Sequence, residues 1–161
     1  MIGKSRSILG EGKKVWEKYP TDYRIYASDE AREYAEEKAT DLQSQLASQF
    51  PNFVKPMLQS HVTGGFWLGL PRSFCMKYLP KKNTHMTLLD EDGNESPTLY
   101  LAEKNGLSAG WRGFAIEHGL VDGDALVFEL VTPTKFMVYI IRQNGYYEAD
   151  EDEGLDKRHK R

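Results

Sequence analysis

The sequence predicts a mainly β domain, an antiparallel barrel or sandwich closed by short helical caps. Three observations carry this prediction. About six or seven short apolar segments alternate with a period of two, two short helical segments interrupt them, and no strand–helix–strand rhythm connects them. Of the 161 residues 40% are hydrophobic and 12% aromatic, which is enough for a packed core.

Ahead of these segments, residues 28–50 have the pattern of an amphipathic helix. Ser28 suits the N-cap, and the two acids that follow it suit the positive end of the helix dipole. Apolar residues, mostly alanine, recur at three- or four-residue spacing from Ala31 to Leu46, and Pro51 is expected to end the helix. Two interpretations remain open: a solvated helix that packs on the domain, or a helix that binds a partner or self-associates. Two heptads are few for a self-sufficient coiled coil.

After Pro51 the apolar period changes to two. The segment FVKPML (53–58) is expected to be extended, and Pro56 restricts it to an edge of the sheet. The segment GFWLGL (65–70) places three apolar side chains on one face of a strand: Phe66, Leu68 and Leu70. The segment PRSFCMKYLP, which runs between two prolines, predicts a short helix over 71–80.

The second half of the chain predicts a hairpin, another short helix and two further strands. HMTLL and SPTLYLA flank the turn DEDGN, in which Gly93 can adopt a positive φ. RGFAIEHG is a helix that ends at Gly119, and DALVFEL and FMVYIIR alternate well. The stretch Gly106–Leu130 is therefore interpreted as frame, with Gly123-Asp124 as a turn, except for its leading edge, Gly106 to Ser108, which belongs to a candidate binding loop. Its expected core residues are Trp111, Phe114, Leu120, Leu126 and Phe128.

Residues 1–27 lack a period and are expected to be loosely ordered. Residues 146–161 hold an acidic run followed by KRHKR, which predicts a disordered tail. The basic cluster is alternatively a nuclear import signal or a phosphate-contacting arm. The net charge is −3, but residues 50–145 hold nine Lys/Arg and nine Asp/Glu. Charge therefore neither excludes nor demonstrates a polyanionic partner.

The sequence argues against membrane spans and against common catalytic sites. No apolar run approaches ~18 residues, no secretory signal is recognisable, and Cys75 is the single cysteine, which fits a reducing compartment. The four histidines lack partners at metal-ligand spacing, and phosphate-loop, dinucleotide and nucleophile-elbow motifs are missing. A Cys–His nucleophilic pair is the remaining enzymatic alternative, although a small buried hydrophobe is the default for Cys75. We therefore predict no enzyme, no metal and no cofactor.

Two polar loops remain as candidate binding segments. The first, Gln59–Gly65, offers an amide, hydroxyls and an imidazole, with glycines that allow close approach of the backbone. The second is AEKNGLSAG (102–110). Side chains of these types hold DNA phosphates and read base edges. Each loop taken alone is also explained as an ordinary solvated connection.

Two long stretches resemble the plant B-three DNA-binding domain, which auxin-response factors and reproductive-meristem-type regulators share. They are FVKPMLQSHVTGGFWLGLPRSFCMKYLP and GLSAGWRGFAIEHGLVDGDALVFEL, and the resemblance covers about residues 50–145. In the first stretch the matching residues are Phe53, Lys55, Met57, Leu58, Ser60, Leu70, Pro71, Phe74, Leu79 and Pro80. In the second they are Leu107, Ser108, Gly110, Trp111, Phe114, Leu120, Gly123, Asp124, Phe128 and Leu130.

The resemblance implies a seven-stranded open antiparallel pseudobarrel over residues 51–145, with two short capping helices and the N-terminal helix outside the barrel. It implies a plant transcription factor, located in the nucleus and without a cofactor, that grips the DNA major groove with two arms. The arms map to Lys55 with Gln59–Gly65 and to about Lys104–Ser108. The expected DNA contacts are Lys55, Gln59, Ser60, His61, Thr63, Arg72, Lys77, Lys104, Asn105 and Ser108.

The chain departs from the family pattern in both arms. His61 stands where many members have an acid after the serine, and the second arm is short, with one basic residue. The expected positive face is Lys55, His61, Arg72, Lys77 and Lys104, which predicts a salt slope near ~4. We therefore predict sequence-specific binding of double-stranded DNA by a transcriptional regulator. The alternative is a protein-interaction or dimerisation module, using the helix at 28–50, that has lost specific DNA binding.

Overall fold

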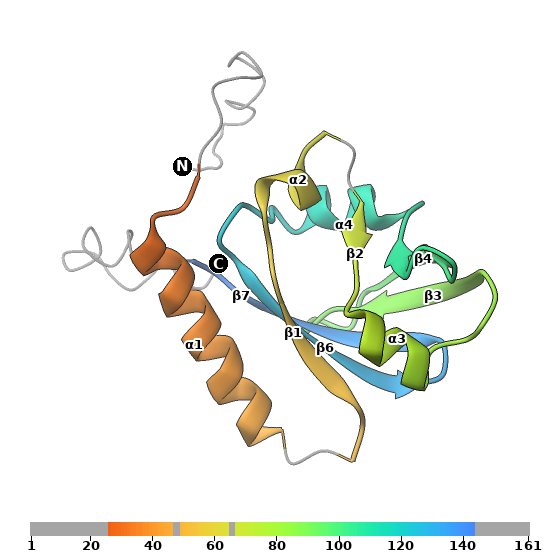
Figure 1. Ribbon diagram of the computed structural model, residues 1–161. Helices are drawn as coiled ribbons and strands as arrows, with labels where there is room; N and C mark the ends of the chain where they lie inside the picture. Colours follow the sequence, from red (N-terminus) through yellow and green to blue (C-terminus); the bar gives the residue numbers. More distant parts are fainter. Residues whose placement is uncertain (1–25, 47–48, 65–66, 144–161) are drawn as a thin grey trace.

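The computed structural model of the protein describes residues 26–46, 49–64 and 67–143, which form one seven-stranded sheet with four helices around it (Figure 1). The strands are β1 (Asn52–Pro56), β2 (Leu68–Gly69), β3 (Thr84–Leu89), β4 (Glu95–Leu101), β5 (Gly106–Leu107), β6 (Ala125–Thr132) and β7 (Lys135–Ile141). The helices are α1 (Asp29–Gln45), α2 (Gln59–Val62), α3 (Arg72–Tyr78) and α4 (Trp111–Glu117).

The strand order β1-β6-β7-β3-β4-β5-β2 makes β1 and β2 the two edges of an open half-barrel. The predicted mainly β fold and the edge position of the Pro56 strand are confirmed. The prediction of a wholly antiparallel sheet is wrong for one pair of strands, because β3 and β7 are parallel, with Leu88 opposite Phe136. Alternation along a strand identifies its buried face but carries no information about the direction of its neighbour.

The core is an aromatic cluster supplied by three strands and one helix. Phe53 of β1 stacks on Phe128 of β6 at a centroid distance of 5.0 Å and meets Phe74 of α3 edge-on at 4.7 Å. Phe136 of β7 packs edge-on against Phe128 at 5.2 Å. Both geometries are preferred for aromatic pairs. The five core residues predicted within Gly106–Leu130 are buried, so its interpretation as frame is confirmed.

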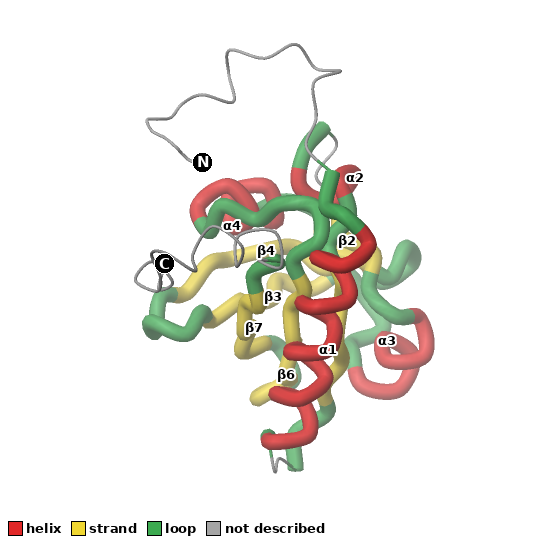
Figure 2. Tube along the Cα trace, turned by 90° about the vertical axis from the view of Figure 1, so that its left-hand side faces the viewer, coloured by secondary structure: helices red, strands yellow, loops and turns green. Residues whose placement is uncertain are grey.

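Helix α1 packs on the outer side of β1, β6 and β7, away from this core (Figures 1 and 2). The Ser28 N-cap is confirmed, because its side chain accepts a hydrogen bond from the backbone of Ala31 at 3.0 Å. Three alanines of the helix are fully buried: Ala31, Ala35 and Ala39. Their small side chains let the helix lie close to the sheet, so the interpretation as a solvated helix that packs on the domain is confirmed. The helix ends at Gln45, several residues before the expected stop at Pro51.

The short elements follow the turn chemistry of the sequence with two additions. The expected helices are found as α3 and α4, and the hairpin turn places Gly93 at φ 90°. The additions are α2, which makes three short helices rather than two, and the short strand β5. Leu68 and Leu70 are buried as predicted, whereas Phe66 lies outside the described residues. The same holds for most of the segment 1–27 and for all of the tail 146–161, including KRHKR.

Candidate nucleic-acid interface

The first polar segment is a single helical turn, α2, rather than the expected loop. The backbone N–H of Gln59 donates to Asp122 Oδ1 at 3.1 Å, which fixes the start of the turn. The Gln59 amide donates to Thr63 Oγ1, and the Thr63 hydroxyl donates to the Gln59 carbonyl at 3.0 Å. Gln59 and Thr63 therefore hold the turn together, while Ser60 is exposed on it. The helical turn was missed because its capping partner, Asp122, lies 63 residues away.

His61 stabilises the same turn and is neutral at neutral pH. Its Nδ1 accepts a hydrogen bond from the Leu58 N–H at 3.0 Å, so in the neutral ring the proton lies on Nε2. Burial and the positive charge of Lys55 lower the pKa of His61 to about 4, against a smaller opposing effect of Asp122. The expected place of His61 in the positive face is therefore wrong. Burial also lowers the pKa of Lys55, which lies on β1 shortly before the turn.

The second polar segment is a tight turn over residues 102–105, between β4 and β5. Asn105 adopts φ 53°, and its amide nitrogen donates to Tyr100 Oη and to the Ala102 carbonyl. The amide expected to read a base therefore shapes the turn. Lys104 is exposed at the turn, but the expected arm is too long, because Gly106 and Leu107 are buried in β5. Ser108, beyond the strand, donates to the Leu99 carbonyl at 3.3 Å.

The two segments enter the β2–β5 pair from opposite ends. The pair is antiparallel, with Leu68 opposite Leu107 and Gly69 opposite Gly106. The first segment leads into β2 ahead of Leu68, and the second leads into β5 ahead of Gly106. Figure 1 shows α2 above β2, near the end of the strand opposite to α3. An edge pair of two short strands thus has a polar segment at each end.

Trp67 lies across this edge pair and was not among the candidates expected from the sequence. A Cβ added at Gly106 would lie 2.3 Å from Cζ2 of Trp67, and one added at Gly69 would lie 3.7 Å from its Nε1. The indole therefore covers both glycines of the cross-strand pair, and it is half-buried. The signal in the sequence is a tryptophan two residues ahead of a glycine, in WLG, where Gly69 leaves room for the ring.

Of the two expected contacts on α3, one lies beside the second segment. The Leu70 N–H donates to the Asn105 carbonyl at 2.8 Å, which brings the start of α3 next to the turn that carries Lys104. Arg72, the first residue of α3, is exposed there. Lys77 is exposed at the other end of the helix, about 7 Å further along its axis. Its ammonium group lies 5.3 Å from the centroid of the Tyr78 ring.

Frame residues hold the first segment from outside. The Trp111 indole nitrogen donates to the His61 carbonyl at 2.8 Å, and Asp122 accepts from the first residue of α2. Trp111 was expected in the core and is fully buried, but its hydrogen bond to α2 could not be inferred from its spacing. For Asp122 the signal is an acid beside a glycine in a turn, a position at which carboxylates bond nearby backbone.

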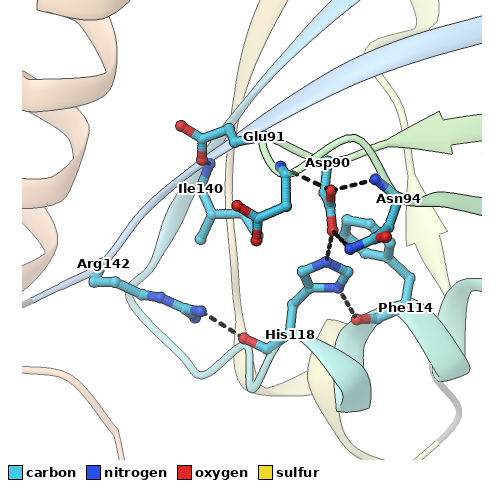
Figure 3. A network of polar contacts seen from close by, with 8 residues as sticks. Asp90, Glu91, Asn94, Phe114, His118, Ile140 and Arg142 are labelled. Atoms are coloured by element: carbon cyan, nitrogen blue, oxygen red, sulfur yellow. Dashed lines mark hydrogen bonds and ion pairs between the residues drawn. The ribbon is translucent and has the colours of Figure 1, made fainter. Parts of the chain in front are cut away.

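His118 is a structural link rather than a catalytic residue (Figure 3). Its Nε2 lies 2.9 Å from Asp90 Oδ2, and its Nδ1 lies 2.9 Å from the Phe114 carbonyl oxygen. Arg142 donates to the His118 carbonyl at 2.6 Å, at the end of α4. Burial tends to raise the pKa of Asp90, but hydrogen bonds from His118 and from the backbone of the β3–β4 turn outweigh it and lower that pKa. The network ties this turn to α4.

The described residues offer little for metal or thiol chemistry. No group of three or more His, Cys, Asp or Glu in residues 26–46, 49–64 and 67–143 is arranged to hold a metal ion. Cys75 is 2% exposed, and burial raises the pKa of its thiol, as expected for a small buried hydrophobe. No helix in the same ranges is long and apolar enough to cross a membrane.

The fold and the two polar segments define a small β recognition module, a half-barrel whose edge pair carries a polar turn at each end. The model of the B3 DNA binding domain family matches residues 53–144, and the chain belongs to this family. The family is one of DNA-binding domains and not of enzymes, so the expectation of a non-enzymatic DNA-binding domain is confirmed at this level.

Relatives of known sequence agree with this assignment. The chain is 61% identical over 128 residues to a B3 domain-containing protein of Oryza sativa subsp. japonica, across 80% of the chain and 54% of the relative. It is 61% identical over 129 residues to a B3 domain-containing protein of Arabidopsis thaliana, across 80% of the chain and 47% of the relative. The chain thus spans about half the length of the curated relatives it matches.

One solved structure with a comparable arrangement is that of a hypothetical Arabidopsis thaliana protein. It is 28% identical and covers 58% of this chain and 92% of its own, with a TM-score of 0.49. At this score the likeness adds nothing to the fold that the strand order already defines.

Proposed function

We propose that this chain binds double-stranded DNA sequence-specifically in the major groove, as part of a transcriptional regulator that acts in the nucleus. Membership of the B3 DNA binding domain family provides the DNA-binding part. Sequence specificity, groove, regulatory role and nuclear location are the proposal.

One observation supports this function best: the polar segments lie at opposite ends of the β2–β5 edge pair. An edge with a polar turn at each end can contact a duplex at two separated points while the short strands lie between them. The major groove is ~12 Å wide and admits a two-stranded β element. DNA bound in this way is contacted on both sides of the Trp67 indole.

The burial of the ten expected contacts divides them by role. We assign direct contacts to the exposed side chains of Ser60, Arg72, Lys77 and Lys104, the last three as phosphate ligands. Lys55 lies on β1 ahead of the first turn, and His61 lies within the turn, where it offers a neutral Nε2–H donor suited to base acceptors. The remaining residues hold the turns in shape: Gln59, Thr63, Asn105 and Ser108.

Selection from a random duplex library tests the proposal. We expect the intact chain to enrich one motif, and Ser60→Ala to weaken binding to it. The matched control is Ser44→Ala on α1, whose hydroxyl donates to the Asp41 carbonyl far from the edge pair. Enrichment of no motif, or equal affinity for an enriched duplex and its scrambled version, would refute sequence-specific binding. Imaging of a fluorescent fusion in plant cells tests the nuclear location.

The alternative, a dimerisation module that uses the helix at 28–50, gains no support from the packing. The apolar stripe of α1 that would form such an interface is already buried against Ala125 and Val127. The side chains that α1 leaves exposed are mostly charged, among them Glu33, Glu36 and Lys38. Light scattering distinguishes the two cases, because a dimer mass for the intact chain would favour the alternative.

A further inference from the structure

The carboxylate of Asp122 joins α1 to the first turn of the DNA-contacting edge. Asp122 lies between α4 and β6, and its side chain is 2% exposed. Its Oδ2 accepts from the Ala27 N–H at 2.7 Å and from Arg32 Nη2 at 2.5 Å. Its Oδ1 accepts from the Gln59 N–H at 3.1 Å. One buried group therefore collects donors from the start of α1, from its first turns and from the first residue of α2.

The turn that carries Asp122 is itself bound to both segments. The Met57 N–H donates to the Asp124 carbonyl at 2.7 Å, and the Gly123 N–H donates to the Met57 carbonyl at 2.9 Å. On its other side the turn touches the residue before the N-cap of α1, since a Cβ added at Gly123 would lie 2.4 Å from the Ala27 Cβ. The end of β1 and the start of α1 are thus packed against the same three residues.

Helix α2 has little to hold it besides these external bonds. It is a single turn of four residues, too short to be stable by its own hydrogen bonds. Two bonds from outside anchor it, Gln59 N–H to Asp122 at its start and Trp111 Nε1 to the His61 carbonyl near its end. The first of these anchors depends on where the Asp122 carboxylate points, and Arg32 is the charged group that holds that carboxylate from α1.

We propose that α1, which lies outside the residues matched by the family model, is a working part of the DNA-binding unit. In this view Arg32 is a positioning residue: it orients Asp122, and Asp122 orients α2 and the Ser60 side chain that α2 presents. A buried carboxylate that loses its charged partner is left under-compensated and moves toward water or other donors. That movement takes the Gln59 anchor with it. The effect on DNA binding rests on the proposed function above, whereas the link between α1 and α2 does not.

The test compares two variants that each remove one positive charge from α1. Arg32→Met breaks the link to Asp122. Lys38→Met is the matched control, because Lys38 is exposed and its contact is with the Tyr34 ring of the same helix, 5.5 Å away. Arg32→Lys keeps a charged donor and is expected to keep most of the link to Asp122. This variant also provides a test if the methionine variant folds poorly.

Two measurements are made on the intact chain. The first is the NMR signal of the Gln59 amide and of the Trp111 indole N–H. We expect both to shift in Arg32→Met and to stay in place in Lys38→Met. The second is the affinity for the duplex that the wild-type chain selects from a random library. We expect a loss of about tenfold in Arg32→Met at an unchanged salt slope, since Arg32 contacts no phosphate in this arrangement.

The outcomes separate the inference from the proposed function. Unchanged Gln59 and Trp111 signals in Arg32→Met would overturn the link between α1 and α2. A loss of affinity accompanied by a salt slope lower by about one would show that Arg32 is a phosphate contact, which overturns its positioning role. If the wild-type chain selects no duplex, the proposed function fails, and the NMR shifts alone then decide the structural link.

Discussion

The indole nitrogen of Trp111 donates a hydrogen bond to the carbonyl oxygen of His61 at 2.8 Å, although 50 residues separate them in the chain. A fully buried residue of the frame thereby holds the helical turn that we propose to touch DNA. The packing of the half-barrel and the geometry of its edge are therefore not independent.

Trp111→Phe keeps most of the ring but removes this donor. We expect it to lower the free energy of unfolding by about 1–3 kcal/mol, because a partly buried carbonyl loses its partner and a small cavity forms. Chemical denaturation measures the loss. Trp67→Phe, at a half-buried position on the edge pair, is the matched control and should cost less. A Trp111→Phe protein as stable as the wild type would contradict this role.

The pKa of His61 gives the first turn a pH dependence. It is lowered from 6.5 to about 4 by burial and by Lys55, so the folded state prefers the neutral ring. The stabilising contribution of neutral His61 is fully present above pH 6.5, and it is lost as the pH falls through about 4. NMR titration of the imidazole measures this pKa.

Lys55→Met tests the electrostatic part of that shift. Without the neighbouring positive charge we expect the pKa of His61 to rise from about 4 toward its ordinary value, while burial still holds it below that value. The control is Lys104→Met, which removes an equal charge from the other polar turn. An unchanged pKa in Lys55→Met would mean that burial alone lowers it.

Three exposed cations are assigned as phosphate ligands at the proposed interface: Arg72, Lys77 and Lys104. We expect the logarithm of the binding constant to fall with the logarithm of salt concentration with a slope of about −2.7. Arg72→Gln should reduce this slope by about 0.9, whereas Lys135→Gln should leave it unchanged, because Lys135 pairs with Glu95 on another part of the sheet. A slope of about −10 for the wild-type chain would mean that further cations contact the DNA.

Asp90→Asn tests the network of Figure 3. Both ring nitrogens of His118 face acceptor oxygens in the wild type. Because the pKa of Asp90 is lowered in the folded state, the contribution of Asp90 to stability is present above pH 3.8 and is lost as the pH falls through its folded pKa. We expect the variant to lose about 1–3 kcal/mol at neutral pH and to lose this acid dependence. Thermal unfolding between pH 3 and 7 measures both. Asp92→Asn, exposed in the same turn, is the control and should resemble the wild type.

Gly123→Ala tests the contact between the Asp122 turn and α1. Gly93→Ala is the matched control, because both glycines have a positive φ, 98° and 90°, but a Cβ at Gly93 would meet nothing within 4 Å. We expect about 1–2 kcal/mol of destabilisation from φ alone in the control. Gly123→Ala should cost at least about 1 kcal/mol more, because its Cβ would overlap that of Ala27 and crowd the Gln143 side chain. Equal losses of stability in the two variants would show that α1 moves aside without a further cost in free energy.

Local chemistry in the sequence determined most of the elements. Ser28 caps α1, Pro71 and Pro80 bracket α3, and Gly93 turns the β3–β4 hairpin, because each acts on backbone within a few residues of itself. The two-residue alternation identified the buried faces of the long strands. Residue order and spacing were enough to indicate the family, since its motifs lie within single elements and their turns.

Only the tertiary structure decided how these elements meet and what the site residues do. The parallel pairing of β3 with β7 depends on how two hairpins close the core. The helical form of Gln59–Val62 depends on Asp122, and the neutral state of His61 depends on burial and on Lys55. These are interactions between segments that lie far apart along the chain or differ in burial. Residue spacing along the sequence contains no information about distances in space or about desolvation energies. It therefore identified the polar residues of the edge but not which of them hold the turns in shape.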